Sequence, residues 1–227
     1  MTKTKQRKRT GLHREGRRML LIVCLVVFIL NITAYFYWPH WILATLLALS
    51  ALALVFVMYF FRDPVRVFTI DDPNYLVAPA DGKVVVIEPV MENEYFHEER
   101  LQVSIFMSPF NVHANWYPCE GTVLVSEHQA GNHKAAWLPK SSTENERSLV
   151  VIQTKSKAII AVRQIAGAMA RRIVTYARAG KECHRNSHLG FIKLGSRVDL
   201  YLPLNTEMFV EIGENVRGNQ TVIAKLH

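Results

Sequence analysis

The sequence has few cysteines, and the three that it has are far apart. Cys24, Cys119 and Cys183 form no C-x-x-C pair and no closely spaced set. Disulfide frameworks and structural zinc sites both need such sets, so the sequence predicts neither, and it predicts no metal site of another kind. A reducing compartment fits this cysteine usage.

Charge is absent from two long stretches near the N-terminus. Residues 19–38 and 41–61 contain no Asp, Glu, Lys or Arg, and only Pro39 and His40 separate them. As a helix, each stretch would be roughly 30 Å long, which is the thickness of a bilayer core. We therefore expect a membrane helical hairpin over 19–61 with both ends on one side. Two helices in a soluble core are the weaker alternative, because such helices rarely lack charge over this length.

Beyond the first 18 residues the chain is almost neutral. Residues 1–18 hold eight Lys or Arg and the single acid Glu15, a net charge of +7, which leaves +1 of the total +8 for the rest. A nearly neutral remainder argues against a nucleic-acid partner. The tail suits an anionic lipid surface. With Arg62 and Arg66 after the second run, the positive-inside rule places both hairpin ends in the cytoplasm.

The rest of the chain is predicted to be mainly β-structure. A polar, turn-rich linker is expected over 62–75, and a β domain over 76–227. Its strand-like runs are 84–87, 101–107, 121–125, 148–153 and 158–162. Residues 166–176 fit a short helix, although 173–176 also fit a strand, and 209–224 resemble the hammerhead hairpins of lipoyl and biotinyl carrier domains. The predicted fold class is a mainly β (β-rich α+β) soluble domain after an N-terminal transmembrane helical hairpin.

A Gly-Ser pair stands between two strand-like runs in residues 189–203. Apolar and polar residues alternate after it, with Val198, Leu200 and Leu202 set against Arg197, Asp199 and Tyr201. This period of two predicts a half-buried strand. Gly195 leaves its own carbonyl sterically open, and the Ser196 hydroxyl is within reach of that carbonyl.

Attack by the Ser196 hydroxyl on the Gly195 carbonyl would move the acyl group from nitrogen to oxygen. β-Elimination would then split the chain, and hydrolysis would leave a pyruvoyl group at position 196. A turn inside a hairpin is the alternative, and from the dipeptide alone it is the better interpretation.

The wider context favours the chemical interpretation. Residues 191–199, F-I-K-L-G-S-R-V-D, resemble the processing site of the short, bacterial-type phosphatidylserine decarboxylases. The resemblance runs from Leu12 to Lys225 and includes F-F-R-D-P at 60–64. It implies cleavage between Gly195 and Ser196 and a covalent pyruvoyl cofactor derived from Ser196, which would form a Schiff base with the amine of the substrate.

The same resemblance implies a function and a location. Phosphatidylserine would be decarboxylated to phosphatidylethanolamine and CO2 by a heterodimer of the two cleaved chains, with further oligomerisation left open. The location would be the bacterial inner membrane, with the catalytic domain on the cytoplasmic side and anionic lipid as a further partner.

Two motifs carry expected catalytic residues. Asp81 matches the Pro-x-Asp-Gly segment of the family and would orient a histidine, whereas an ordinary hairpin turn is the alternative. His113 follows Ser-Pro, as in the family, and would act as a general acid. Many longer relatives have a second histidine where this chain has Trp116. Either His113 serves both steps, or His184 or His188 supplies one.

Residues 145–147 carry the expected substrate site, with a polar loop as the alternative. In the family the Asn145-Glu146-Arg147 trio lies near the substrate, and the planar fork of Arg147 suits a phosphate or carboxylate. Two other functions stay open: a pyruvoyl decarboxylase of a soluble amino acid, and a non-enzymatic, membrane-tethered carrier or adaptor domain. A carrier would show a lysine at its hairpin tip, and residues 213–219 contain none.

Overall fold

The computed structural model describes residues 11–131, 145–167, 172–193 and 196–227. The chain divides into two compact units, Met1–Val65 and Arg66–His227. Gly195 therefore lies outside the described residues, whereas Ser196 opens a strand.

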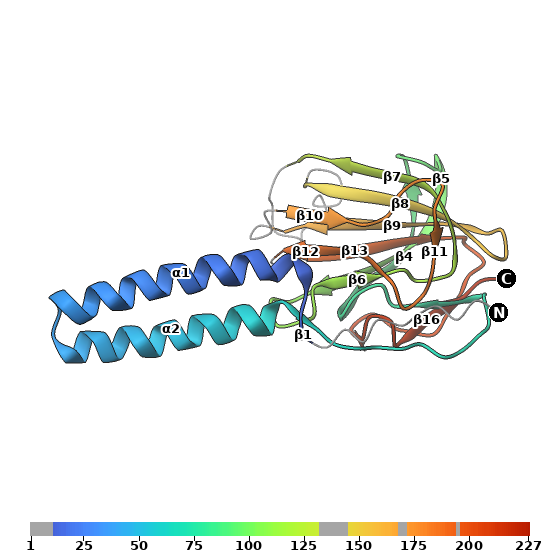
Figure 1. The fold of residues 1–227 in the computed structure, drawn as a ribbon. Coiled ribbons are helices and arrows are strands. Elements are labelled where there is room, and N and C mark those ends of the chain that lie inside the picture. The colour runs from blue at the N-terminus through green and yellow to red at the C-terminus, as the bar shows by residue number, and fades with distance from the viewer. Residues whose placement is uncertain (1–10, 132–144, 168–171, 194–195) are drawn as a thin grey trace, which may run out of the picture. The chain divides into compact units, whose positions relative to one another are not determined.

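The first unit is a helical hairpin (Figure 1). Helix α1 (Arg14–Tyr37) and helix α2 (His40–Phe60) are joined by two residues. Strands β1 (Gly11–Leu12) and β2 (Arg62–Asp63) pair antiparallel at the base of the hairpin. Both ends of the hairpin therefore lie together, as predicted. Helix α1 begins before the uncharged run because the backbone N–H of Glu15 donates to Nδ1 of His13, which caps the helix.

Apolar side chains cover the outside of this hairpin. Leu21 and Trp41 are each 71% exposed, and both helices are long and apolar enough to cross a membrane. Between the helices, Nδ2 of Asn31 donates to Oγ of Ser50 at 2.8 Å. Polar side chains that bond each other across two helices are typical of hairpins in an apolar environment. The first unit thus indicates membrane association.

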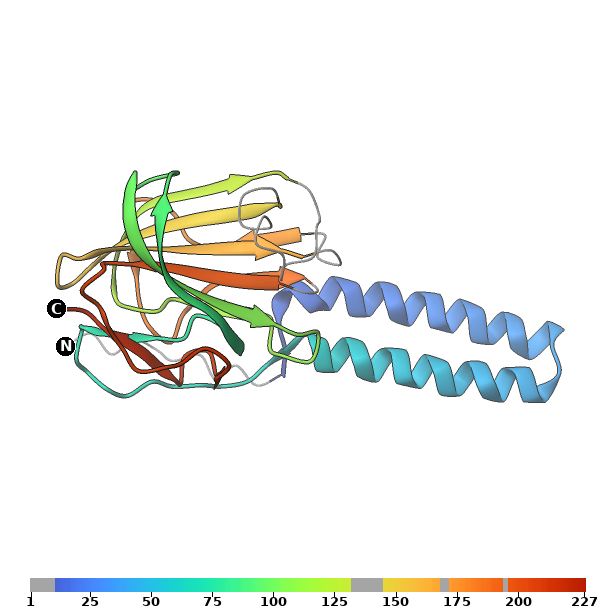
Figure 2. The ribbon, with the colours of Figure 1, turned by 180° about the vertical axis from the view of Figure 1, so that it is seen from behind.

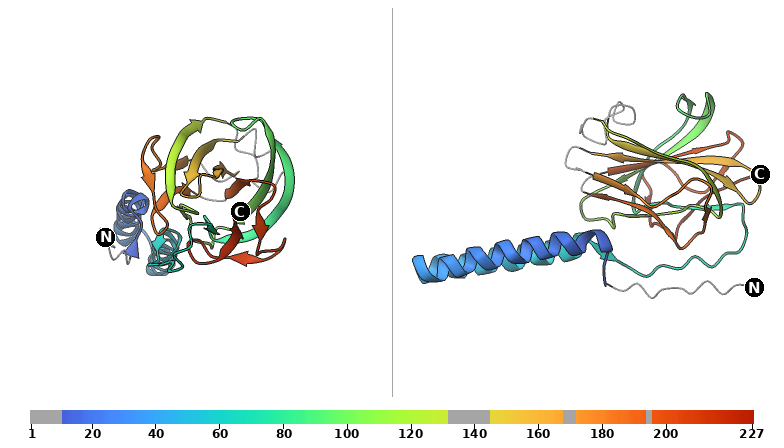
Figure 3. Two further views of the ribbon diagram at one scale, coloured as in Figure 1. Left: turned by 90° about the vertical axis from the view of Figure 1, so that its right-hand side faces the viewer. Right: turned by 45° about the horizontal axis from the view of Figure 1, so that its top comes forward.

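The second unit is built on an eight-stranded antiparallel sheet that curls on itself (Figures 2 and 3). The strand order is β11-β7-β8-β9-β13-β5-β4-β15. The long strands are β4 (Gly82–Glu92), β5 (Glu98–Met107), β7 (Gly121–Gln129), β8 (Arg147–Thr154), β9 (Ile159–Ala166) and β13 (Ser196–Leu202). The edge strands are β11 (Glu182–Cys183) and β15 (Asn215–Val216).

Two three-stranded sheets complete the unit, and the predicted fold class is confirmed. One has the order β10 (Arg172–Thr175), β12 (His188–Lys193), β6 (Ala114–Trp116). The other has the order β14 (Glu207–Met208), β16 (Val222–Lys225), β3 (Tyr75–Val77).

Two local predictions are settled in detail by these strands. The strand interpretation is right for 173–175, which lie in β10, while residues 168–171 of the alternative helix lie outside the described residues. The hammerhead-like hairpin expected over 209–224 has no strand at 209–212. Phe209 N donates to Ile223 O, and the chain then turns at Gly213, where φ is +97°.

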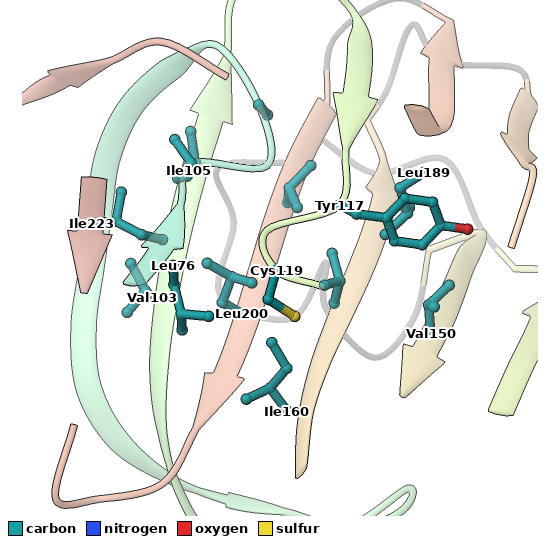
Figure 4. Packing of buried hydrophobic residues seen from close by; sticks show 14 of the residues in the cluster. Leu76, Val103, Ile105, Tyr117, Cys119, Val150, Ile160, Leu189, Leu200 and Ile223 are labelled. Atoms are coloured by element: carbon teal, nitrogen blue, oxygen red, sulfur yellow. The ribbon is translucent and has the colours of Figure 1, made fainter. Parts of the chain in front are cut away.

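Strand β13 lies in the middle of the large sheet and carries part of the core. Val198, Leu200 and Leu202 are fully buried in the main hydrophobic cluster, together with Leu76 and Ile160 (Figure 4). Burial of such a side chain is worth about 1.5–3 kcal/mol, so this face of β13 stabilises the sheet strongly.

The opposite face of β13 is buried too, so the prediction of a half-buried strand is wrong. Arg197, Asp199 and Tyr201 are 4%, 0% and 2% exposed. Their polar groups are kept from water because the long strands curl over this face, where a second apolar cluster contains Tyr201 and Leu149. Nε of Arg197 donates to Oδ1 of Asp199 at 2.8 Å, so the two charges neutralise each other.

A buried carboxylate organises the turn between β4 and β5. Glu92 accepts backbone hydrogen bonds from Glu94, Tyr95 and Phe96 at 3.1, 2.8 and 2.9 Å, and Nη2 of Arg163 lies 2.6 Å from its Oε1. Burial raises the pKa of Glu92, but the three N–H donors and Arg163 outweigh burial and hold the pKa below its ordinary value. The resulting stabilisation is present above the unfolded pKa and is lost as the pH falls through the folded pKa.

Glu92→Gln should therefore lower the free energy of unfolding near neutral pH by about 1–3 kcal/mol, because Arg163 is left with a weaker partner. The difference from the wild type should shrink as the pH falls below the ordinary glutamate pKa of about 4.3. It should be lost as the pH passes through the lower pKa of the folded Glu92. Urea unfolding of the full chain over a pH series measures both effects. The control is Glu88→Gln, which removes an exposed charge from the same strand. Equal midpoints for the two variants at every pH would contradict the assignment.

Candidate functional site

One end of the large sheet contains Ser196 and Arg147, two of the candidate site residues. Lys83, Phe106, Arg197, Ile165 and Arg147 are register partners in succession across β4, β5, β13, β9 and β8. In the next row, the backbone of Ser196 pairs with Met107 and with Ala166. We call this the Ser196 end of the sheet. It places Ser196 at the first position of a strand that is held on both sides.

The chain before Ser196 is held in a different sheet. Strand β12 ends at Lys193 and pairs antiparallel with β10 and β6. Only residues 194 and 195 separate it from β13. The predicted cleavage site thus lies between two strands whose backbone hydrogen bonds are made independently of each other.

His113 lies beside the strand that leads to the predicted cleavage site. Its carbonyl accepts a hydrogen bond from Ile192 N at 3.2 Å, and its ring centre lies 6.5 Å from that of Phe191. The ring is fully buried, and Nδ1 is 3.0 Å from the carbonyl oxygen of Asn111. Because a carbonyl only accepts, Nδ1 carries the proton, and in the neutral ring Nε2 is the nitrogen that can take up another.

A short turn sets the backbone that carries His113. After β5, the N–H and the hydroxyl of Ser108 both donate to Oδ1 of Asn111, at 2.8 and 2.7 Å. An Asn side chain bonded in this way closes a turn locally. The Ser-Pro-Phe-Asn sequence thus turns the chain from β5 in the large sheet to β6 beside β12.

Asp81 directly precedes β4, which lies two strands away from β13, the strand that begins at Ser196. With neighbouring strands about 4.8 Å apart, the two backbones are about 10 Å apart. The Asp81 carboxylate accepts from both Nη atoms of Arg66, one of them at 2.8 Å, and from Gly218 N at 2.8 Å. In the described part of the chain no hydrogen bond joins Asp81 to His113. The expected role of Asp81 in orienting a histidine therefore remains a prediction.

The Asn-Glu-Arg trio divides between two tasks. Nδ2 of the fully buried Asn145 donates to Ala166 O at 2.7 Å, and Ala166 N donates to Glu146 O at 2.9 Å. Both residues thereby support the strand partner of Ser196. Arg147 instead donates from Nε to Oε1 of Glu94 at 2.8 Å. A substrate phosphate would compete with Glu94 for Arg147, and the substrate-binding role of Asn145 and Arg147 remains a prediction.

Sequence reasoning missed two buried polar networks. One network lies on the face of the sheet that carries Tyr201, opposite the main hydrophobic cluster; we call it the outer face. There Arg163 bridges Glu92 and Glu94 and donates to the Tyr201 hydroxyl. Burial, and then the negative charge of Asp199, raise the pKa of Tyr201, so its hydroxyl stays protonated. On the core face, Ser148 Oγ donates to Gln164 Oε1 and Gln164 Nε2 donates to Asn115 Oδ1, each at 2.7 Å.

The core-face network could have been found from the strand period. Ser148 and Gln164 stand at positions of β8 and β9 where alternation places apolar residues such as Val150 and Val162. A polar residue in the buried register of a strand needs a partner and therefore indicates such a network. The outer-face network had no comparable signal, because its acids and arginines stand at positions expected to face water.

The two alternative histidines, His188 and His184, are placed differently from His113. His188 begins β12 opposite Trp116, with the ring centres 5.2 Å apart. From there β12 runs for about 17 Å to Lys193. The His184 side chain is 50% exposed and lies 3.7 Å from Glu182. Of these three histidines, His113 is the one beside the end of β12 that leads to Ser196.

Comparison with known proteins matches this arrangement to a family. The family model described as "Phosphatidylserine decarboxylase" matches residues 53–224. The chain belongs to the phosphatidylserine decarboxylase family. Among its relatives, the "Phosphatidylserine decarboxylase proenzyme" of Bacteroides thetaiotaomicron is 53% identical over 227 residues, which is 100% of both chains.

Further relatives of the same printed name are similar over nearly their whole length. That of Parabacteroides distasonis is 54% identical over 94% of this chain and 98% of its own. That of Cytophaga hutchinsonii is 47% identical over 95% of this chain and 99% of its own. The resemblance to phosphatidylserine decarboxylases is thus confirmed over both units of the chain.

Proposed function

We propose that this chain is the precursor of a membrane-associated enzyme that decarboxylates phosphatidylserine to phosphatidylethanolamine and CO2. Its family and its proenzyme relatives support the activity. The observation that carries the mechanism is the position of Ser196 at the start of β13, between Met107 and Ala166, with β12 paired separately.

Self-cleavage begins with attack by Ser196 Oγ on the Gly195 carbonyl carbon. The carbon–nitrogen bond breaks, the proton of the hydroxyl passes to the released nitrogen, and an ester joins the two parts. β-Elimination then expels the Gly195 carboxylate and leaves a dehydroalanine at position 196. One water is consumed and one ammonia is released as the pyruvoyl group forms. The products are chain 1–195 and chain 196–227.

The residues around position 196 fit such a group. The backbone at position 196 pairs with Met107 and Ala166, and these residues would hold a ketone formed at that position. Asn145 keeps the Ala166 carbonyl bonded on the far side. When present, the pyruvoyl group supplies an electrophilic carbonyl that condenses with an amine and takes up electrons from a breaking carbon–carbon bond.

The side chains of the site have distinct tasks in this proposal. His113 holds or donates a proton at Nε2, because Asn111 fixes the proton on Nδ1. Arg147 receives the anionic part of the headgroup by exchanging its bond to Glu94. The hairpin of the first unit keeps the enzyme on the bacterial inner membrane, with residues 1–18 and 62–227 cytoplasmic and the basic tail on anionic lipid.

Ser196→Ala tests the cleavage step directly. The wild type should purify as two chains, the smaller being residues 196–227 with a pyruvoyl group in place of its N-terminal amine, whereas Ser196→Ala should remain one inactive chain. Intact mass and phosphatidylserine decarboxylation are measured together. The control Ser156→Ala changes an exposed serine and should be cleaved normally. Wild-type protein that is fully active and uncleaved would refute the proposal.

His113→Ala tests the proton donor. Any variant protein that completes cleavage should bind phosphatidylserine but turn it over about 10²- to 10⁴-fold more slowly, the usual contribution of a general acid or base. Single-turnover CO2 release from vesicles is the measurement, and His188→Ala is the comparison. A full loss with His188→Ala and none with His113→Ala would transfer the role to His188.

Removal of residues 1–65, the whole first unit, tests the role of the hairpin. The shortened protein should act on dispersed, short-chain phosphatidylserine but lose most activity on vesicles, because only vesicle-bound lipid requires tethering. Salt should weaken whatever vesicle activity depends on the tail, since the Debye length falls to about 10 Å at 0.1 M. Equal activity on vesicles with and without the hairpin would show that the hairpin is not needed for access to the lipid. A preference for a free amino acid would contradict phosphatidylserine as the substrate.

A further inference from the structure

Six residues form a cluster of contacts that holds residues 66–68, at the start of the second unit, against the β domain. We call them the linker clasp: Arg66, Asp81, Trp116, Asn186, Gly218 and Asn219. The centre of the clasp is the pair in which Arg66 donates from Nη1 and Nη2 to the two carboxylate oxygens of Asp81. Their side chains are only 10% and 9% exposed. A two-pronged pair of this kind fixes the relative orientation of both groups.

Two further contacts hold the same pair. Gly218 N donates to Oδ1 of Asp81 at 2.8 Å, and Arg66 Nη1 donates to Gly218 O at 2.9 Å. The guanidinium carbon of Arg66 lies 5.1 Å from the centre of the Trp116 ring. A Cβ at position 218 would come within 2.6 Å of Trp116, so only glycine fits this close approach.

Two asparagines bind the linker backbone itself. Nδ2 of Asn219 donates to Arg66 O at 3.1 Å and to Asn186 Oδ1 at 2.7 Å, and Phe68 N donates to Asn186 Oδ1 at 2.7 Å. Asn186 and Asn219 have φ of +68° and +56°, a conformation that asparagine adopts more readily than most residues. Residues 66–68 are therefore docked through backbone and side chain.

The clasp connects two sheets that meet at the Ser196 end. Asp81 directly precedes β4, whose Lys83 lies in the row that contains Arg197. Trp116 is the last residue of β6, which begins directly after His113 and pairs with β12. Arg66 thus contacts Asp81, which precedes β4 in the sheet of β13, and Trp116, which lies in β6 beside β12. Strands β13 and β12 carry the residues on either side of the predicted cleavage site.

We propose that Arg66 is a positioning residue for self-cleavage, acting through Asp81 and Trp116, so that the linker is part of the processing machinery. The proposal rests on the proposed function, because it assumes cleavage at Ser196. The Asp81 carboxylate has Arg66 as its charged partner, and Arg66 packs on the aromatic ring at position 116. Without Arg66, the side-chain bridge from Asp81 to Trp116 is lost, and the backbone bond from Trp116 N to Pro79 O at 2.8 Å remains between the two segments. His113 and Ser196 then lose their alignment.

The rate of processing of the full chain tests this proposal. The chain is synthesised in a cell-free reaction with lipid vesicles, and conversion to two chains is followed over time. Arg66→Met should slow conversion about 10- to 100-fold, since a misplacement of about 1 Å at a reacting centre can cost 10²-fold. Arg66→Lys keeps the charge but not the two-pronged guanidinium group, so its conversion rate should lie between those of the wild type and Arg66→Met. The control Arg178→Met removes an exposed arginine and should match the wild type.

Two readouts separate positioning from general stability. The double variant Arg66→Met/Asp81→Asn should be no slower than the slower single variant, because both changes break the same contact. Guanidinium ion at non-denaturing concentration should restore cleavage of Arg66→Ala, which leaves space for it, whereas sodium ion should not. If Arg66→Met folds poorly, this rescue still distinguishes a positioning role of Arg66 from a general loss of stability.

The outcomes are distinct. Normal conversion of Arg66→Met, or failure of guanidinium to restore Arg66→Ala, would overturn the positioning role while leaving the proposed function intact. Multiplicative slowing in the double variant would also overturn it. A wild type that is never converted would instead refute the proposed function.

Discussion

The pairing of β13 on both sides is the constraint on which the rest of the structure depends. Residues 196–201 are register partners of both β5 and β9, so the strand is hydrogen-bonded along both of its edges. A backbone in this position cannot shift without breaking many bonds at once. Cleavage at the proposed site in front of this strand would leave the new chain end paired on both sides within the sheet.

Both faces of β13 fix the register in which the strand pairs with its neighbours. A slip by one residue would place Arg197 and Asp199 in the hydrophobic core and would place Val198 and Leu200 among the buried charges. Each exchange would leave charges unpaired in an apolar surrounding, which is far more costly than a paired charge. The ion pairs of the outer face therefore contribute to the location of Ser196 as much as the apolar face does.

Much of the fold followed from the sequence, and the reasons are local. Uncharged runs predicted the hairpin, and strand periods predicted the long strands of the β domain. The strand predicted after the Gly-Ser pair is present as β13, which begins at Ser196. The burial of Arg197 and Asp199 could not be read in the same way, because strand period alone does not reveal that another strand curls over a polar face.

The candidate site was predictable only in part, because it is assembled from distant segments. His113 was identified by its motif, and the structure places it beside β12. The partner of Asp81 was not predicted, because Arg66 belongs to the stretch 62–75 that was expected to be a linker. Arg66 contacts Asp81 only in the folded domain. Pairings between residues far apart in the chain are decided by the sheets, and one sequence contains no direct record of them.

The strands after residue 196 are woven through the whole domain, which has a consequence for the life of the molecule. Strand β13 lies inside the large sheet, β15 lies at the edge of that sheet beside β4, and β14 and β16 form a small sheet with β3, which precedes residue 196. In the uncut chain these segments are tethered, and folding is a unimolecular search. Once the chain is cut, an unfolded molecule must recover its smaller part from solution and pay the translational entropy of association. The uncut precursor is thus the form suited to folding, and thermal unfolding of the mature form is expected to be irreversible, so that its lifetime is governed by the unfolding rate.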